Sequence, residues 1–146
     1  MAELGHVVFY VRELGRSSAF YRDVVGLNEI GRIFDGRGAL FSGGRTHHEL
    51  LLIEVEQAPG PLHGNRIGLY HVGWKVGDTL EQLRGALRRA ENFGCDIDGL
   101  SDHTVSQSLY LRDPDGNEVE LYVDDPDYDW DESDDWMEAP VRQLEL

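Results

Sequence analysis

The hydrophobic pattern divides the chain into two similar halves. Segments Leu4–Leu14 and Leu69–Asp78 are strand-like, and they are alike around His6 and His71. Short runs rich in valine and aromatic residues are typical of β-strands. A stretch with helical spacing of apolar residues follows each segment, and further strand-like segments follow that. The pattern therefore predicts the order βαβββ, twice.

One helix is predicted in each half. In the first, Leu14, Tyr21 and Val25 share a helical face, and Gly26 ends the helix. In the second, Asp78 is the expected N-cap, with Glu81 three residues later in a capping box. The apolar stripe of the second helix and its closing glycine are Leu80, Leu83, Leu87, Ala90 and Gly94.

Further strand-like segments follow each helix. They are Leu27–Phe34, Gly38–Ser42 and His48–Glu56 in the first half, and Asp96–Leu100, Ser106–Arg112 and Asn117–Val123 in the second. The turn signal Asp113-Pro-Asp-Gly-Asn joins the last two as a hairpin. This order of elements predicts an α+β fold with helices on one face of the sheet.

A linker rich in proline and glycine, around Pro59 and Pro61, separates the halves. We expect a single domain over residues 1–123, with one module at about 1–58 and a second at about 66–123. Residues 124–146 form an acidic C-terminal tail, with nine acidic residues, Trp130 and Trp136 between positions 124 and 138. The acids are expected to be solvated, and the two indoles to dock onto the domain or a second subunit.

Strand alternation predicts which side chains share a surface. In the first strand and its repeat, the larger apolar residues point toward the helices, which leaves His6 and His71 on the opposite, concave face. Gly73 leaves room for a ligand beside His71. In the last strand, Glu120 and Tyr122 face the same way. If the hairpin turn pairs Arg112 with Glu118, Tyr110 lies directly opposite Glu120.

The strand His48–Glu56 adds further polar candidates. Leu51, Ile53 and Val55 are expected to face the core, which places His48 and Glu54 on the concave face. His48 can then act as an acid/base near a metal without being a ligand. No functional role is predicted for two other histidines. We interpret His47 as structural or solvated, and His63 as a linker residue. His103 precedes a hairpin strand and could reach the mouth of a pocket.

Two imidazoles and one carboxylate are the donor set of a facial triad, which leaves coordination positions open for substrate and dioxygen. A single His or Glu on a strand is usually a satisfied polar residue. Three of them, at matching places in a repeated unit, predict a site for one divalent metal ion. The predicted ligands are His6, His71 and Glu120.

Composition and charge limit the partners and the cellular compartment that we expect for the protein. The formal net charge of −15 disfavours nucleic acid and anionic membranes as partners. Cys95 is the only cysteine, so an intrachain disulfide is excluded and a reducing compartment is expected. No apolar run approaches the roughly 20 residues of a membrane span, and the first residues lack the features of an export signal. We therefore expect a cytoplasmic protein, with a homodimer as a further expectation.

The chain resembles the vicinal oxygen chelate superfamily, which includes glyoxalase I, fosfomycin- and bleomycin-resistance proteins and type I extradiol dioxygenases. The resemblance rests on the paired βαβββ pattern, on Phe20-Tyr-Arg-Asp-Val-Val-Gly-Leu27 and on Asp113-Pro-Asp-Gly-Asn-Glu-Val-Glu-Leu-Tyr122. It implies a curved, barrel-like mixed sheet with helices outside. Leu4-Gly-His6, Arg45-Thr-His-His48-Glu-Leu50 and the run from Ser108 to Glu120 look like the catalytic domain of catechol 2,3-dioxygenases.

The resemblance implies roles for individual residues. It implies His6, His71 and Glu120 as ligands of Fe(II), His48 as the acid/base residue, and Tyr110 as a hydrogen-bond partner of the bound substrate. His103 resembles a substrate-pocket histidine of these enzymes, although it lies closer to the tyrosine in sequence than expected.

The predicted function is therefore metal-dependent extradiol cleavage of a catechol-like aromatic substrate by O2, with iron favoured and manganese left open. One alternative is a glyoxalase I-like or fosfomycin-resistance-like isomerase or transferase using zinc, nickel, cobalt or manganese, for which Glu54 would be the expected fourth ligand. A second alternative is a metal-free drug-binding protein of the bleomycin-resistance type.

Overall fold

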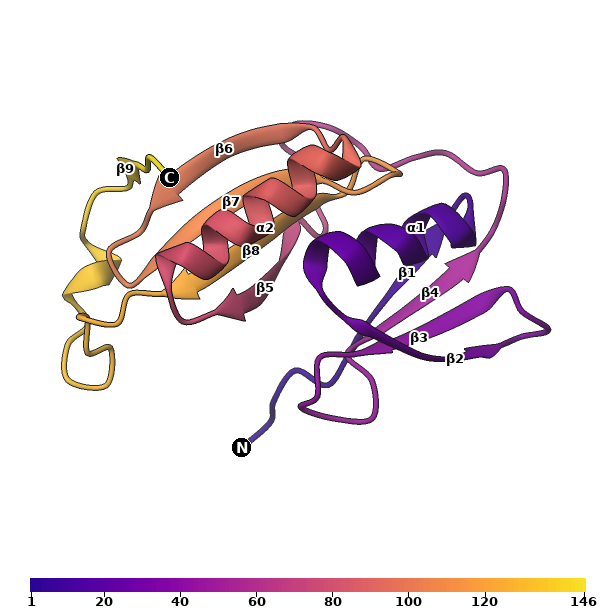
Figure 1. The fold of residues 1–146 in the computed structure, drawn as a ribbon, viewed down its shortest axis with the longest axis horizontal. Helices are drawn as coiled ribbons and strands as arrows, with labels where there is room; N and C mark the ends of the chain where they lie inside the picture. Colours follow the sequence, from indigo (N-terminus) through magenta and orange to yellow (C-terminus); the bar gives the residue numbers. More distant parts are fainter. The chain divides into compact units, whose positions relative to one another are not determined.

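Each half of the chain folds around its own mixed sheet in the computed structural model, which describes residues 1–146 (Figure 1). The first unit comprises Met1–His63 with Pro114–Gly116. The second comprises Gly64–Asp113 with Asn117–Leu146. The α+β class and the repeated βαβββ order are confirmed, with each sheet open.

The first unit contains a four-stranded sheet and one helical segment. Along the chain its elements are β1 (Val7–Val11), α1 (Leu14–Phe20), a π-helical turn η1 (Tyr21–Val25), β2 (Asn28–Ile33), β3 (Gly38–Ser42) and β4 (Leu50–Glu54). The strand order is β1-β4-β3-β2, with β1 and β4 parallel. Gly26 ends the helical segment in the left-handed conformation, as its sequence position predicts.

The second unit repeats this arrangement and extends it. Its elements are β5 (His71–Gly77), α2 (Leu80–Phe93), β6 (Ile97–Asp102), β7 (Ser106–Arg112), β8 (Glu118–Asp124), a 3₁₀ turn η2 (Asp135–Met137) and β9 (Arg142–Gln143). The strand order is β5-β8-β7-β6-β9. The first four strands thus follow the same order as those of the first unit, and β9 is added at the β6 edge.

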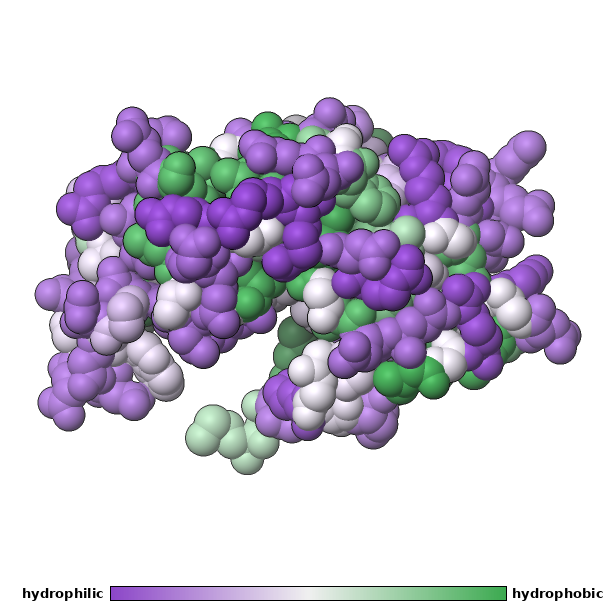
Figure 2. All heavy atoms as spheres, viewed as in Figure 1, coloured by the Kyte–Doolittle hydropathy of each residue, from purple (hydrophilic) through white to green (hydrophobic).

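The core of the second unit lies between its sheet and α2. Val119, Leu121 and Val123 of β8 are completely buried, as the alternation predicts. From α2, the buried residues are Leu83, Ala86 and Ala90, whereas Leu80 remains 37% exposed. Hydrophilic side chains cover the outer side of α2 (Figure 2). Burial of this one apolar face is what holds the helix on the sheet.

The second helix begins one residue later than expected. Thr79, not Asp78, is the N-cap: its hydroxyl accepts a hydrogen bond from Gln82 N–H at 3.2 Å, and Gln82 Oε1 accepts one from Thr79 N–H at 3.1 Å. Asp78 instead pairs with Lys75 at 2.7 Å. The sequence carries two overlapping capping-box patterns, and the ion pair with Lys75 holds the Asp78 side chain away from the helix start.

The facing of β4 is the reverse of that expected. Leu50 and Leu52 are completely buried, and Leu51 and Ile53 are only partly buried. Parallel pairing with β1 explains this, because Phe9 pairs with Leu52, and paired residues point to the same side of a sheet. The helix-facing set of β4 is therefore Leu50, Leu52 and Glu54. The prediction that Leu51, Ile53 and Val55 face the core was wrong.

None of the helices combines the length and apolar character that a membrane span needs.

Candidate functional site

The β7–β8 hairpin brings a phenol and a hydroxyl onto one carboxylate. Its register pairs Tyr110 with Glu120 and Arg112 with Glu118, as predicted. Tyr110 donates a hydrogen bond to Glu120 Oε1 at 3.0 Å, and Ser108 donates to the same oxygen at 2.6 Å. Burial, reinforced by the Glu120 charge, raises the pKa of Tyr110, so the phenol is protonated at neutral pH and available as a donor.

His71, the first residue of β5, lies between two carboxylates of β8. Its Nε2 is 3.2 Å from Glu120 Oε2, and its Nδ1 is 3.3 Å from Glu118 Oε2. Glu118 is buried, with 9% of its side chain exposed, whereas that of Glu120 is 16% exposed. A ring whose Nδ1 faces a buried carboxylate, while its Nε2 lies beside a second predicted ligand, has the orientation typical of a metal-binding histidine.

His103 joins the same cluster through Tyr110. Its Nε2 is 2.8 Å from the Tyr110 hydroxyl. Because that hydroxyl donates its only proton to Glu120, His103 Nε2 is the donor in this contact. The result is a hydrogen-bonded chain from His103 through Tyr110 to Glu120. The structure thus brings together four of the predicted site residues in the second unit: His71, His103, Tyr110 and Glu120.

The first unit holds a separate cluster of histidines. The rings of His6 and His48 have centroids 4.7 Å apart, and His48 Nδ1 is 2.6 Å from His47 Nδ1. Desolvation, with contributions from His47 and His6, lowers the pKa of His48, so this ring is neutral at pH 7. A neutral imidazole can both accept and donate a proton. His6 directly precedes β1, the place that corresponds to His71 at the start of β5.

Glu54 is occupied by a structural contact. Its Oε2 accepts a 2.7 Å hydrogen bond from the backbone N–H of Leu14, the first residue of α1. Glu13, the N-cap of this helix, provides no side-chain hydrogen bond, so the Glu54 carboxylate satisfies a donor at the start of α1 from a neighbouring strand. The prediction that Glu54 faces the concave surface was wrong.

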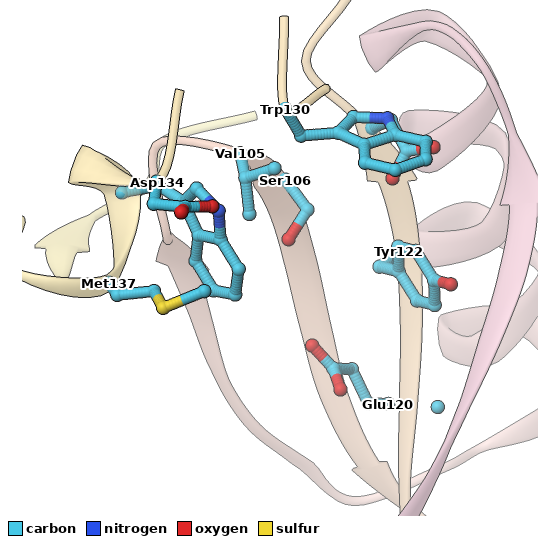
Figure 3. A pocket seen from close by; sticks show the side chains of 10 residues that line it. Val105, Ser106, Glu120, Tyr122, Trp130, Asp134 and Met137 are labelled. Atoms are coloured by element: carbon cyan, nitrogen blue, oxygen red, sulfur yellow. The ribbon is translucent and has the colours of Figure 1, made fainter. Parts of the chain in front are cut away.

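A pocket of about 690 Å³ opens on the concave side of the second unit. From the sheet, its lining includes Gly73, Glu120, Tyr122 and Asp124. Figure 3 shows Tyr122 and Glu120 on the same side of β8, with the Glu120 carboxylate directed into the pocket. The volume lies within the range of sites that bind small organic molecules.

Sequence reasoning missed two residues of the cluster, Ser108 and Glu118. Both could have been found from strand parity, because Ser108 lies two residues before Tyr110 and Glu118 two residues before Glu120. Residues two apart on a strand share a face. Ser108 orients one oxygen of Glu120, and Glu118 orients His71.

The residues around Glu120 fit a divalent metal ion. Two donors at right angles on one ion, each about 2.1 Å from it, lie about 3 Å apart, and His71 Nε2 and Glu120 Oε2 are separated by 3.2 Å. Neither unit by itself contains three or more His, Cys, Asp or Glu side chains grouped to hold a metal. Within the second unit, His71 and Glu120 are therefore the candidate pair.

The family can be identified by comparison with known proteins. Residues 3–121 match the family model described as the glyoxalase/bleomycin resistance protein/dioxygenase superfamily. A catechol-2,3-dioxygenase of Bacillus subtilis (strain 168) is 36% identical over 128 residues, which are 87% of this chain and 43% of that protein. A biphenyl-2,3-diol 1,2-dioxygenase 2 of Rhodococcus globerulus is 31% identical over 93 residues, which are 63% of this chain and 48% of that protein.

The chain thus spans less than half the length of each of these two curated relatives. Among solved structures, a lactoylglutathione lyase from Agrobacterium tumefaciens matches with a TM-score of 0.61 and 28% identity, over 84% of this chain and 94% of that chain. The fold and the family model agree. The chain belongs to the glyoxalase/bleomycin resistance protein/dioxygenase superfamily.

Proposed function

We propose that this chain is a metal-dependent extradiol-type dioxygenase that cleaves a catechol-like aromatic ring with O2. The observation that carries the proposal is the arrangement around Glu120, where Tyr110 donates to one carboxylate oxygen and His71 lies 3.2 Å from the other. Relatives named as ring-cleaving dioxygenases support the same reaction class.

The proposed metal ligands are His6, His71 and Glu120, with Fe(II) as the favoured ion. The assignment of His71 and Glu120 is supported by their separation and by the Glu118 contact that orients the imidazole. The assignment of His6 is supported by its place at the start of β1, which corresponds to that of His71 at the start of β5. When bound, the ion supplies Lewis acidity and a route for electrons between substrate and O2.

The remaining residues have roles in positioning and proton transfer. His48 is neutral at pH 7, so it can accept a proton from the substrate and return it as the ring opens. Tyr110 is a protonated donor that can turn from Glu120 to a substrate oxygen. His103 hydrogen-bonds the Tyr110 hydroxyl at 2.8 Å and steadies it beside Glu120.

The isomerase or transferase alternative is less well supported. Its expected fourth ligand was Glu54, and this carboxylate is held by the Leu14 N–H on the helix side of the sheet. The metal-free binding alternative gives no reason for His71 to lie between Glu118 and Glu120.

The proposal is tested by loading the protein anaerobically with Fe(II) and measuring oxygen uptake with a panel of catechols, while following the yellow ring-cleavage product. We expect one metal ion per chain and uptake coupled to colour. Metal bound at one equivalent without oxygen use on any catechol would refute the dioxygenase assignment.

Two variants separate metal binding from proton transfer. Glu120→Gln should abolish metal retention, because the amide is a weaker ligand for a hard cation. His48→Phe should keep the metal and lose at least ~100-fold in kcat, the usual range for removal of a general acid/base. Normal turnover by His48→Phe would show that the assigned role is wrong.

A further inference from the structure

The acidic C-terminal segment, residues 125–141, is tied to the second unit at both ends. At its start, Asp125 N–H donates to Val105 O at 2.9 Å, and Gln107 Nε2 donates to the Asp125 carboxylate at 3.0 Å. At its end, β9 pairs with β6, and Arg142 lies 3.6 Å from Asp102. A segment anchored in this way has a defined course across the sheet.

Contacts within the segment order its middle. The Tyr128 hydroxyl donates to the Asp135 carboxylate and accepts from the backbone N–H of Trp136 at 3.0 Å. The 3₁₀ turn η2 then presents Trp136 and Met137 on consecutive positions. The tyrosine thereby fixes the turn that carries these two apolar side chains.

The segment forms one wall of the pocket that contains Glu120. Trp130, Asp134, Trp136 and Met137 line it together with the residues of the sheet. Figure 3 shows Trp130 and Met137 across the pocket from Glu120. Trp130 is 57% exposed and Met137 is 63% exposed. Large apolar side chains left in water around a concave site are typical of a surface that a hydrophobic ligand covers.

The charge of this wall is negative. Residues 124–138 contain nine acidic side chains and no lysine, arginine or histidine. None of the side chains that line the pocket is basic. Lys75 contacts Asp124 at 2.8 Å but also Asp78 at 2.7 Å, so its single charge is shared between two carboxylates. An anionic group on a ligand would meet only like charge here.

We propose that the segment 125–141 is a specificity wall. It selects catechols that carry an uncharged apolar substituent, such as a second ring, and rejects catechols that carry a carboxylate. Trp130, Trp136 and Met137 contact the substituent, and Asp134 repels an anionic group. This inference rests on the proposed dioxygenase function for the identity of the reacting ring, but the preference of the wall is a property of binding.

The test therefore measures binding and turnover separately. Calorimetry on the metal-free protein compares 2,3-dihydroxybiphenyl, catechol and 2,3-dihydroxybenzoate as probes, and kcat/KM is measured for the same three compounds with Fe(II)-loaded protein. We expect dihydroxybiphenyl to bind at least tenfold more tightly than dihydroxybenzoate. Trp136→Ala should reduce that ratio at least fivefold, and Trp136→Phe should retain most of it.

Charge reversal provides the matched control. Asp134→Lys should strengthen dihydroxybenzoate binding at least fivefold. Asp127→Lys, the same charge change in the same segment outside the pocket lining, should alter it less than twofold. Both positions are exposed, so both variants are expected to fold.

The outcomes distinguish the two proposals. The specificity wall would be overturned if the protein cleaves the ring but no variant in the segment alters the ratio of the dihydroxybiphenyl and dihydroxybenzoate affinities by more than twofold. The dioxygenase function would then still stand. Absence of ring cleavage, with the binding preference and its loss in Trp136→Ala both observed, would overturn the dioxygenase function and support the wall.

Discussion

A single methyl group at position 73 tests whether Glu120 is a metal ligand. Gly73 pairs with Glu120 across the β5–β8 ladder, and a Cβ on Gly73 would lie 3.1 Å from Glu120 Oε2 and 3.6 Å from the nearest Tyr122 ring carbon. A contact of 3.1 Å is too close by a few tenths of an ångström, so the carboxylate must shift. The φ angle of Gly73 lies outside the left-handed region, so the backbone accepts alanine.

The expected effect of Gly73→Ala on metal binding is larger than its effect on folding. Metal sites tolerate errors of about 0.2 Å in ligand distance, and disturbance of the groups that orient a ligand weakens metal binding about 10- to 100-fold. We expect the effect of Gly73→Ala to lie at the lower end of this range. The Fe(II) affinity should fall about tenfold, which corresponds to ~1.4 kcal/mol. The free energy of unfolding of the metal-free protein should change by less than about 1 kcal/mol, because the restriction of the unfolded chain by alanine is offset by the displacement of the Glu120 carboxylate.

Two measurements check this prediction. Anaerobic competition between the protein and a chelator gives the Fe(II) affinity, and urea unfolding of the metal-free protein gives the free energy of unfolding. Gly99→Ala in β6 is the matched control, because a Cβ there would meet no atom within 4 Å. Equal metal affinities for Gly73→Ala and Gly99→Ala would refute the reasoning that Glu120 binds the metal from its present position.

Further predictions concern helix starts and the cysteine. Thr79→Ala should lower the free energy of unfolding by about 1 kcal/mol, and Asp78→Ala should lower it by less than about 0.5 kcal/mol. Both values are measured in parallel urea titrations. A larger loss for Asp78→Ala than for Thr79→Ala would contradict the observed cap. Glu54→Ala should cost about 1–2 kcal/mol without changing metal content, whereas Glu54→Gln retains an acceptor and most of the stability; loss of metal in either variant would restore Glu54 as a ligand. Burial raises the pKa of Cys95 to about 11, and only the thiolate reacts, so its alkylation by iodoacetamide should accelerate about tenfold per pH unit between pH 8 and 10. A rate that levels off near pH 9, the ordinary thiol range, would show that the pKa of Cys95 is not raised.

The hairpin was predictable because local chemistry determines its register. A five-residue turn, Asp113-Pro-Asp-Gly-Asn, leaves one pairing that keeps Leu111 and Val119 on the buried face. Strand β7 has the predicted bounds, Ser106–Arg112, and β8 differs by one residue at each end. The contact between Tyr110 and Glu120 follows from that register alone.

The facing of β4 could not be predicted from its own residues. The run Leu50-Leu-Leu-Ile-Glu-Val55 is apolar at both parities, so alternation does not choose a side. Pairing with β1, a strand about 40 residues earlier, makes the choice. The strand also starts at Leu50, so the side chain of His48 is directed by the bend before it and not by strand parity.

The course of the C-terminal segment could not be predicted from its sequence either. Its return strand β9 is only two residues long and has no hydrophobic pattern. What holds it is the free edge of β6, since Ser101 and Asp102 pair with Gln143 and Arg142. The unpaired N–H and C=O groups of an edge strand can pair with any extended segment within reach. Composition predicted solvated acids, most of which are exposed, and docked indoles, but it did not indicate that Trp130 and Trp136 would line the pocket of Glu120.

The two units carry different side chains at one equivalent position of the repeated module. Gly73, the second residue after His71, pairs with Glu120, and Val8, the second residue after His6, pairs with Leu51. Leu51 thus occupies in the first unit the position that the carboxylate of Glu120 occupies in the second. A site with two histidines and two carboxylates would need an acidic residue at that position. With leucine there, the first unit has no carboxylate at this position, which favours the proposed set of three donors, His6, His71 and Glu120, over a set of four.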